Sequence, residues 1–216
     1  MSLPKVTIVI ASSLDGRIAF PNGGESHLGS KEDKKMLNKN LSLVDATIFG
    51  LGTLKAHQST YLIKNHFGNK KAKISERQPI SIVASNSKRF NRNWKYFRQP
   101  IRRWLISSKI VDNSSNNDFE KQLLFENTWE RTLISLKKKG INDLALLGGA
   151  KLINSFIKED LITDIKITII PKIIGGGYTW IPPEQSNEIF NLKRLWEIKS
   201  IKNLKNSEIY VHYKKI

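Results

Sequence analysis

The strongest constraint on the fold is one junction, where an apolar strand runs directly into two glycines and then into a helix. Residues 144–156 begin with the apolar run Leu144–Leu147, continue with Gly148 and Gly149, and end in an apolar-periodic segment. A strand, a tight turn and a helix in this order are typical of parallel α/β sheets. Glycines at such a turn let a phosphate approach the backbone, where N–H groups at the helix start point toward it. The junction therefore predicts an α/β fold and a candidate phosphate site, although paired glycines are also ordinary turn chemistry.

Strand and helix patterns alternate along the rest of the chain. Strand patterns occur at 6–11, 46–50, 80–84, 104–107, 143–147 and 163–170, and helical patterns at 30–41, from Thr53, at 128–139 and at 150–157. Polar loops are expected at 58–78 and 109–118, and the segments 195–201 and 208–213 predict a hairpin. We expect a mostly parallel sheet flanked by helices, with an antiparallel C-terminal hairpin, in a single domain over residues 1–216. Ligands of such sheets bind at the carboxyl ends of the strands.

The composition excludes several kinds of chemistry. The chain has no cysteine, so disulfides, thiolate nucleophiles and Cys-ligated metals are excluded. The histidines do not have the spacing of a metal site, and we predict no metal. No apolar run approaches the ~18 residues of a membrane span. The N-terminal run before residue 11 is too short for a signal peptide, so we expect a cytoplasmic protein without a membrane partner.

The net charge of +17 raises the question of a nucleic-acid partner. The lysines are dispersed along the whole chain, however, and not gathered in one basic arm. A small phosphate-bearing ligand also suits this charge, through electrostatic steering. We therefore do not favour nucleic acid as the partner, and a non-catalytic NADPH- or RNA-binding module stays as an alternative.

Four segments in order resemble a known family. They are residues 12–19, 45–53, 140–149 and 171–177, which read SSLDGRIA, DATIFGLGT, GINDLALLGG and PKIIGGG. This order is similar to the reductase domain of the bacterial riboflavin-biosynthesis deaminase/reductase, which has a dihydrofolate-reductase-like fold. The resemblance implies an NADPH-dependent reductase that acts on the ribosyl chain of a phosphorylated aminopyrimidine, and it implies a homodimer. The zinc deaminase motif of histidine, glutamate and paired cysteines is absent, so we expect no deaminase domain within residues 1–216.

The resemblance assigns the cofactor site to glycine turns and polar turns that follow strands. The implied NADPH-binding residues are Gly16, Gly50, Gly52, Thr53, Ser85, Asn86, Ser87, Lys88, Arg89, Ser107, Gly148, Gly149, Ala150, Lys151, Gly175, Gly176 and Gly177. The basic pair Lys88 and Arg89 favours NADPH over NADH, because a 2′-phosphate dianion needs cationic partners. An ordinary polar turn is the competing interpretation of residues 85–89.

The substrate half of the family pattern is altered. Family members carry a lysine where this chain has Val9, a threonine at Gly29, an arginine at Leu41, an aspartate at His57 and a glutamate at Leu147. Losing one charge-assisted bond costs ~1.5–3 kcal/mol, so the joint loss indicates a changed substrate site. Asp15 and His57 are the candidate catalytic residues, although a structural histidine is the competing interpretation of His57. A reductase of a pteridine, of dihydrofolate or of another small carbonyl compound stays as the alternative activity.

Overall fold

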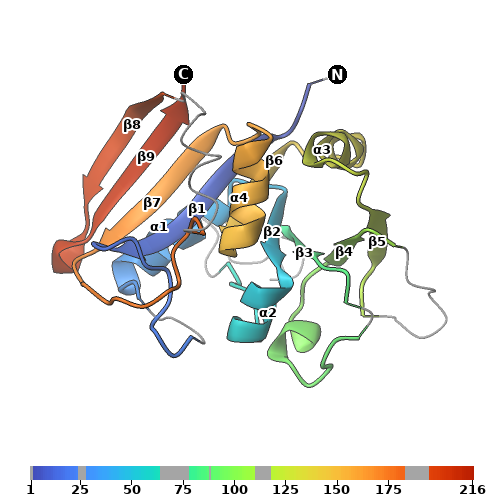
Figure 1. The fold of residues 1–216 in the computed structure, drawn as a ribbon, viewed down its shortest axis with the longest axis horizontal. Helices are drawn as coiled ribbons and strands as arrows, with labels where there is room; N and C mark the ends of the chain where they lie inside the picture. Colours follow the sequence, from blue (N-terminus) through green and yellow to red (C-terminus); the bar gives the residue numbers. More distant parts are fainter. Residues whose placement is uncertain (1, 24–27, 64–77, 88, 110–117, 183–194) are drawn as a thin grey trace, which may run out of the picture.

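The computed structural model describes residues 2–23, 28–63, 78–87, 89–109, 118–182 and 195–216. Its centre is one nine-stranded sheet in the order β5-β4-β3-β2-β6-β1-β7-β9-β8 (Figure 1). The strands are β1 (Lys5–Ser13), β2 (Ala46–Gly50), β3 (Ile80–Ala84), β4 (Arg103–Ser107), β5 (Lys121–Leu124), β6 (Asp143–Gly148), β7 (Asp164–Ile170), β8 (Trp196–Asn203) and β9 (Ile209–Lys215). The helices are α1 (Lys31–Leu41), α2 (Leu51–His57), α3 (Trp129–Lys138) and α4 (Ala150–Lys158), with 3-10 turns η2 (Lys95–Arg98) and η5 (Lys205–Ser207).

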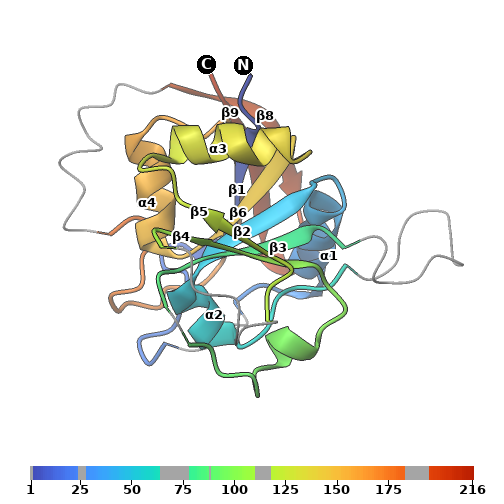
Figure 2. The same ribbon diagram turned by 90° about the vertical axis from the view of Figure 1, so that its right-hand side faces the viewer.

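The sheet has the predicted mixture of strand directions. The pairs from β5 through β7 are parallel, and β9 runs antiparallel to both β7 and β8. Seen close to edge-on, α4 lies on one side of the sheet and α1 on the other (Figure 2). The expected α/β class, with a mostly parallel sheet and an antiparallel C-terminal hairpin, is therefore confirmed. In the described segments, no helix has the length and apolar character needed to cross a membrane.

Successive residues of the strands build two cores, because side chains alternate between the faces of a sheet. On β2, Ile48 belongs to the core that includes Phe156 of α4 and Leu133 of α3. Its neighbour Phe49 belongs to a core on the opposite side, with Leu54 of α2. Both faces of the central strands are covered, which explains their nearly continuous apolar sequence.

Helix starts follow the sequence closely. The Ser30 side chain caps α1 by accepting hydrogen bonds from the backbone N–H groups of Glu32 and Asp33, and Thr128 caps α3.

One predicted boundary needs correction, and one strand was missed. The helix expected from Thr53 begins at Leu51, because Gly50 already occupies the N-cap position. The edge strand β5 was not predicted, because its four residues lack β-branched side chains and are ordered by pairing with β4. Residues 64–77 and 110–117 of the expected loops, and Lys88, lie outside the described residues.

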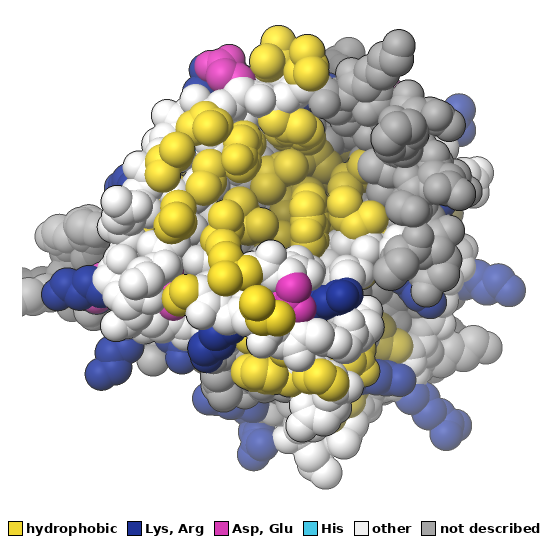
Figure 3. Space-filling model, turned by 60° about the vertical axis from the view of Figure 1, so that its left-hand side comes forward, with side chains coloured by type: hydrophobic (Ala, Val, Ile, Leu, Met, Phe, Trp, Pro, Cys, Tyr) yellow, Lys and Arg dark blue, Asp and Glu magenta, His cyan; other side chains and the backbone are white. Residues whose placement is uncertain are grey.

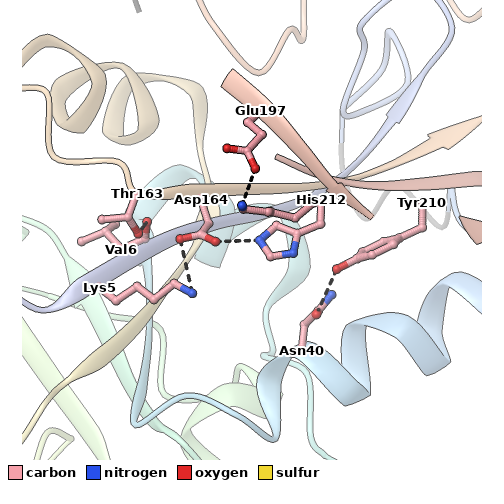
Figure 4. Close-up of polar contacts among 9 residues, drawn as sticks. Lys5, Val6, Asn40, Thr163, Asp164, Glu197, Tyr210 and His212 are labelled. Carbon is pink, nitrogen blue, oxygen red and sulfur yellow. Dashed lines mark hydrogen bonds and ion pairs between the residues drawn. The ribbon is translucent and has the colours of Figure 1, made fainter. Parts of the chain in front are cut away.

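A buried carboxylate joins three strands at the hairpin end of the sheet (Figure 4). Asp164 at the start of β7 lies 2.6 Å from His212 Nε2 on β9 and 3.3 Å from Lys5 Nζ on β1. Its side chain is 2% exposed. Burial acts to raise the pKa of Asp164, but the bonds with His212, Thr163 and Lys5 outweigh it, and the net pKa lies below the ordinary value of 3.8. The folded protein therefore favours the ionised form.

We expect Asp164→Asn to lower the free energy of unfolding by about 1–3 kcal/mol at neutral pH. The loss is moderate because Lys5 and His212 are partly exposed, so water can solvate them when the carboxylate is gone. An acid whose pKa is lowered by folding stabilises above its ordinary pKa, and this contribution disappears as the pH falls through the folded value. Urea denaturation of both proteins across this range measures the difference. It should be largest at neutral pH and shrink below pH 3.8. A difference that stays constant with pH would show that packing, and not the charge, is responsible.

Candidate functional site

A cavity of about 1310 Å³ opens where several parallel strands end. Gly50, Ser85 and Ser107 line it at the ends of β2, β3 and β4, and Gly148 lines it at the end of β6. Helices cover both faces of the sheet, so a pocket can open only at the ends of the strands. In α/β sheets, ligands bind at the carboxyl ends. The pocket therefore lies where the sequence placed the ligand.

Most of the predicted site residues meet in this cavity. The lining includes Gly50, Gly52, Thr53, His57, Ser85, Asn86, Ser107, Gly148, Gly149, Ala150, Lys151 and Gly177. Five other described candidates for cofactor contact lie outside the lining, namely Gly16, Ser87, Arg89, Gly175 and Gly176, and so does Asp15. Four of the five replaced substrate positions line the cavity, namely Val9, Gly29, His57 and Leu147.

The two glycine turns predicted from the sequence lie against each other. A Cβ built on Gly149 would lie 3.2 Å from Thr53 Oγ1, and one on Gly148 would lie 3.6 Å from the same atom. Gly148 also has a φ of +120°, a conformation that residues with a side chain rarely adopt, and the Gly148–Gly149 peptide is cis. The positive φ of Gly148 therefore favours glycine. A side chain at Gly149 would crowd Thr53 in the space between the two turns, the cradle formed by Gly148, Gly149 and Thr53.

The helix starts at these turns have unfilled hydrogen-bonding capacity. Gly149 caps α4, and Gly50 caps α2, without any side-chain hydrogen bond. The first backbone N–H groups of a helix have no partner within it, and they carry partial positive charge. Lys151 adds a full charge in the first turn of α4 and lines the cavity. This end of the cavity can therefore hold an anionic group such as a pyrophosphate.

Polar side chains shape the turns after β3 and β4. The Ser85 hydroxyl accepts a hydrogen bond from Ser87 N at 3.0 Å. Asn86 Oδ1 accepts bonds from Ser108 N at 2.7 Å and from Ser108 Oγ at 2.9 Å. Asn86 therefore ties the two turns together at the rim of the cavity. Lys95 of η2 also lines the cavity, and no sequence pattern had assigned this lysine to the site.

Asp15 ties two loops together at the edge of the site. Its Oδ2 accepts a hydrogen bond from Gly175 N at 2.7 Å, and its Oδ1 accepts bonds from the Ser13 hydroxyl and Ile174 N. These bonds, led by the one from Ser13, hold the pKa of Asp15 far below its ordinary value. An ionised carboxylate with this many donors is a poor proton source. The geometry favours a role in positioning the loop of residues 171–177.

We expect Asp15→Ala to loosen both loops while the remainder of the fold stays intact. Trypsin cuts after Arg17 and Lys172, which flank the tie, so limited proteolysis reports its loss directly. Cleavage there should become roughly tenfold faster, as expected when local opening becomes easier by about 1.4 kcal/mol. Asp45→Ala is the matched control, because Asp45 accepts backbone bonds from Asn142 and Asp143 away from this edge. Equal rates for wild type and Asp15→Ala would contradict the role assigned to Asp15.

The opposite end of the cavity contains charged groups that the sequence did not assign to a site. Asp33 of α1 lines it, together with Lys166 and Thr168 of β7. Lys166 pairs in register with Val9 of β1, the position where the family pattern has a lysine. The lysine missing from β1 is therefore matched by a lysine on the neighbouring strand β7. The sequence indicated only a half-covered strand here, since alternation does not show which polar side chain reaches a cavity. Among the described residues, no three His, Asp or Glu side chains gather as metal ligands.

The fold and the site define an α/β protein with a dihydrofolate-reductase-like sheet and a cavity at its strand ends that is suited to an anionic group. Residues 4–209 match the family model described as the RibD C-terminal domain, and the chain belongs to this family. A crystal structure of a pyrimidine reductase-like protein from Corynebacterium diphtheriae superposes with a TM-score of 0.79 at 15% identity, over 99% of this chain and 92% of that one. This likeness confirms the predicted fold.

Two curated relatives show how far the similarity extends. The riboflavin biosynthesis protein RibD of Haemophilus influenzae is 28% identical over 182 residues, which cover 81% of this chain and 49% of that protein. A 2,5-diamino-6-ribosylamino-4(3H)-pyrimidinone 5′-phosphate reductase of Archaeoglobus fulgidus is 25% identical over 181 residues, covering 80% of this chain and 83% of that protein. The chain thus spans about half the length of the first relative and most of the second.

Proposed function

We propose that the chain is an NADPH-dependent reductase of riboflavin biosynthesis, acting on a phosphorylated ribosylaminopyrimidine. The observation that carries the proposal is the cradle of Gly148, Gly149 and Thr53, which opens beside the uncapped start of α4. The RibD C-terminal domain match and the similarity to the Archaeoglobus pyrimidinone 5′-phosphate reductase support the same reaction. The replaced substrate positions distinguish this chain within the family.

The residues present fit the two anionic groups of the cofactor, its central pyrophosphate and its 2′-phosphate. The first N–H groups of α4 and the side chain of Lys151 would hold the pyrophosphate. Ser85, Asn86 and Lys95 line the cavity beside the turns after β3 and β4, and with Arg89 close by they would hold the 2′-phosphate. When bound, NADPH supplies a hydride to an electrophilic carbon of the substrate. The protein's own contribution is to place the two reactants side by side.

The candidate catalytic residues have different roles in this proposal. Asp15 positions the loop of residues 171–177, because its lowered pKa keeps it ionised. His57 lines the cavity at the end of α2 and stays the candidate to donate a proton or to contact a phosphate. Both assignments are tested by the kinetics of single variants.

Titration with NADPH and NADH, followed by tryptophan fluorescence, tests the cofactor half of the proposal. We expect saturable binding of NADPH and at least ~10-fold weaker binding of NADH, because the 2′-phosphate forms charge-assisted bonds. The titration is independent of the substrate, so it stays decisive if the substrate is a different one. Absence of NADPH binding would overturn the proposal.

We also propose that the protein is a homodimer and that it is cytoplasmic. An exposed hydrophobic face supports the homodimer. Hydrophobic side chains gather over the hairpin side of the molecule (Figure 3). In β8, Ile198 and Ile201 are 51% and 56% exposed, which is unusual for neighbouring apolar residues of a strand. A second copy of the same face would bury them. Sedimentation velocity of wild type and Ile201→Lys tests this, and a monomeric wild type would contradict it.

A further inference from the structure

One carboxyl group in the cavity has no role in the proposed cofactor site. Asp33 lies in the first turn of α1. Among the described residues that line the cavity, it is the one Asp or Glu. The side chain of Thr168 on β7, which lines the cavity too, acts to lower the pKa of this carboxyl group. An acidic side chain in a first helical turn usually faces solvent and favours the helix dipole. Here α1 packs against the sheet, so the carboxyl group is turned toward the interior.

The backbone around Asp33 is arranged to accommodate the carboxyl group. A Cβ built on Gly29 would lie 2.0 Å from Asp33 Oδ2, so the absence of a side chain at Gly29 leaves this space to the carboxylate. The start of α1 is fixed to β9, because Ser30 N and Ser30 Oγ donate to the buried Glu208 at 2.7 and 2.6 Å. Farther into the same end of the cavity, Tyr210 contacts Asn40 at 3.3 Å (Figure 4). Asp33 is thus placed at the anchored start of α1, where it lines the cavity.

Folding acts against the charge on Asp33. Burial is the main cause of a raised pKa, and the negative charge of Glu208 adds to it, while the Thr168 side chain and Lys34 oppose it. Tyr61 is the other titratable group that interacts with Asp33. A ligand that donates N–H bonds would compensate for this unfavourable burial.

We propose that Asp33 binds the N–H edge of a 2-amino-4-oxopyrimidine ring and thereby selects the substrate. This inference rests on the proposed function and specifies its substrate. A ring N–H and the neighbouring exocyclic amine form two adjacent donors, which match the two oxygens of one carboxylate. The corresponding uracil has a carbonyl in place of the 2-amine, and its oxygen would face the carboxylate oxygens. The protein should therefore prefer the 2,5-diaminopyrimidinone substrate over the deaminated 5-aminouracil substrate.

Steady-state kinetics with both phosphoribosylaminopyrimidines test the inference, on wild type, Asp33→Asn and Glu32→Gln. Glu32 is the matched control, because it precedes Asp33 in the same helical turn and pairs with Lys35 at the surface. We expect wild type to prefer the 2-amino substrate by on the order of 10–100-fold in kcat/KM. Asp33→Asn should lose this preference while its NADPH affinity stays within about twofold, and Glu32→Gln should match wild type. A preference that survives in Asp33→Asn, or a wild type that prefers the uracil, would overturn the inference.

Two further probes separate this inference from the proposed function. A fused dihydropteridine presents the same N–H edge, so its reduction by wild type but not by Asp33→Asn would support Asp33 and contradict the riboflavin pathway. If no compound is reduced, calorimetric binding of isocytosine and uracil to the NADPH-bound protein decides the matter. Isocytosine should bind more tightly than uracil to wild type and equally to Asp33→Asn. Equal binding to wild type would overturn the inference.

Folding of Asp33→Asn can be predicted as well. An acid with a raised pKa stabilises the fold below its ordinary value of 3.8, and this contribution is lost as the pH rises through the folded pKa. At neutral pH the variant no longer buries a charge, so its melting temperature should equal or exceed that of wild type. A lower melting temperature would show that the carboxylate is structural.

Discussion

Gly149→Ala is expected to weaken NADPH binding on the order of 100-fold, which corresponds to the loss of at least one charge-assisted hydrogen bond at the start of α4. The added Cβ would lie 3.2 Å from Thr53 Oγ1, so Thr53 or the Gly148–Gly149 turn has to shift. The added methyl group also occupies space that the proposal assigns to the pyrophosphate. The same change leaves the sheet and both cores untouched. Fluorescence titration with NADPH measures the effect.

Gly140→Ala is the matched control for this substitution. Gly140 follows α3 with a φ of +88°, and a Cβ there would meet no atom within 4 Å. Its replacement strains the backbone and lowers stability by about 1 kcal/mol, yet the cavity stays unchanged. Equal NADPH affinities for Gly149→Ala and Gly140→Ala would show that the Gly148–Gly149 turn does not contact the cofactor.

Phe156→Ala is expected to lower the free energy of unfolding by about 3–5 kcal/mol. Phe156 is fully buried in α4, and its ring stacks on that of Trp129 in α3 at 4.5 Å between centroids. Its loss opens a cavity in the core that fixes the helix carrying the Gly148–Gly149 turn. Because α4 presents the candidate phosphate site, NADPH should also bind more weakly to the variant and restore part of its stability.

Urea denaturation of Phe156→Ala and Leu43→Ala distinguishes core packing from a general loss of apolar surface. Leu43 is 65% exposed beside α1, so its truncation should change stability by less than about 0.5 kcal/mol. Similar losses in both variants would contradict the packing described for α4.

Sequence patterns predicted the elements wherever local chemistry determines them. Ser30 and Thr128 begin helices because their side chains cap the backbone, and the strand ending at Gly148 is apolar because both of its faces are covered. The edge strand β5 escaped prediction because its four residues lack β-branched side chains and its strand conformation depends on pairing with β4.

The sequence carried a local signal for the proposed cofactor site, which stays a prediction, but it did not indicate the charged residues at the other end of the cavity. Glycine turns at strand ends carry a local signal, and Gly50, Gly52, Gly148 and Gly149 indeed line one cavity. Asp33 carried no such signal, since a capped helix with an acidic first turn looks the same whether its carboxylate faces solvent or a pocket. Only the packing of α1 against the sheet, which places Asp33 in the cavity together with Thr168, distinguishes the two.

Mixing the protein with NADPH and a phosphoribosylaminopyrimidine, and following the nicotinamide absorbance, tests the proposed activity most directly. We predict that absorbance falls only when both reactants are present, and that mass spectrometry finds a ribityl product heavier by two hydrogen atoms. The diaminopyrimidinone should react faster than the aminouracil. Tight NADPH binding with no oxidation by either pyrimidine would contradict a riboflavin-pathway reductase.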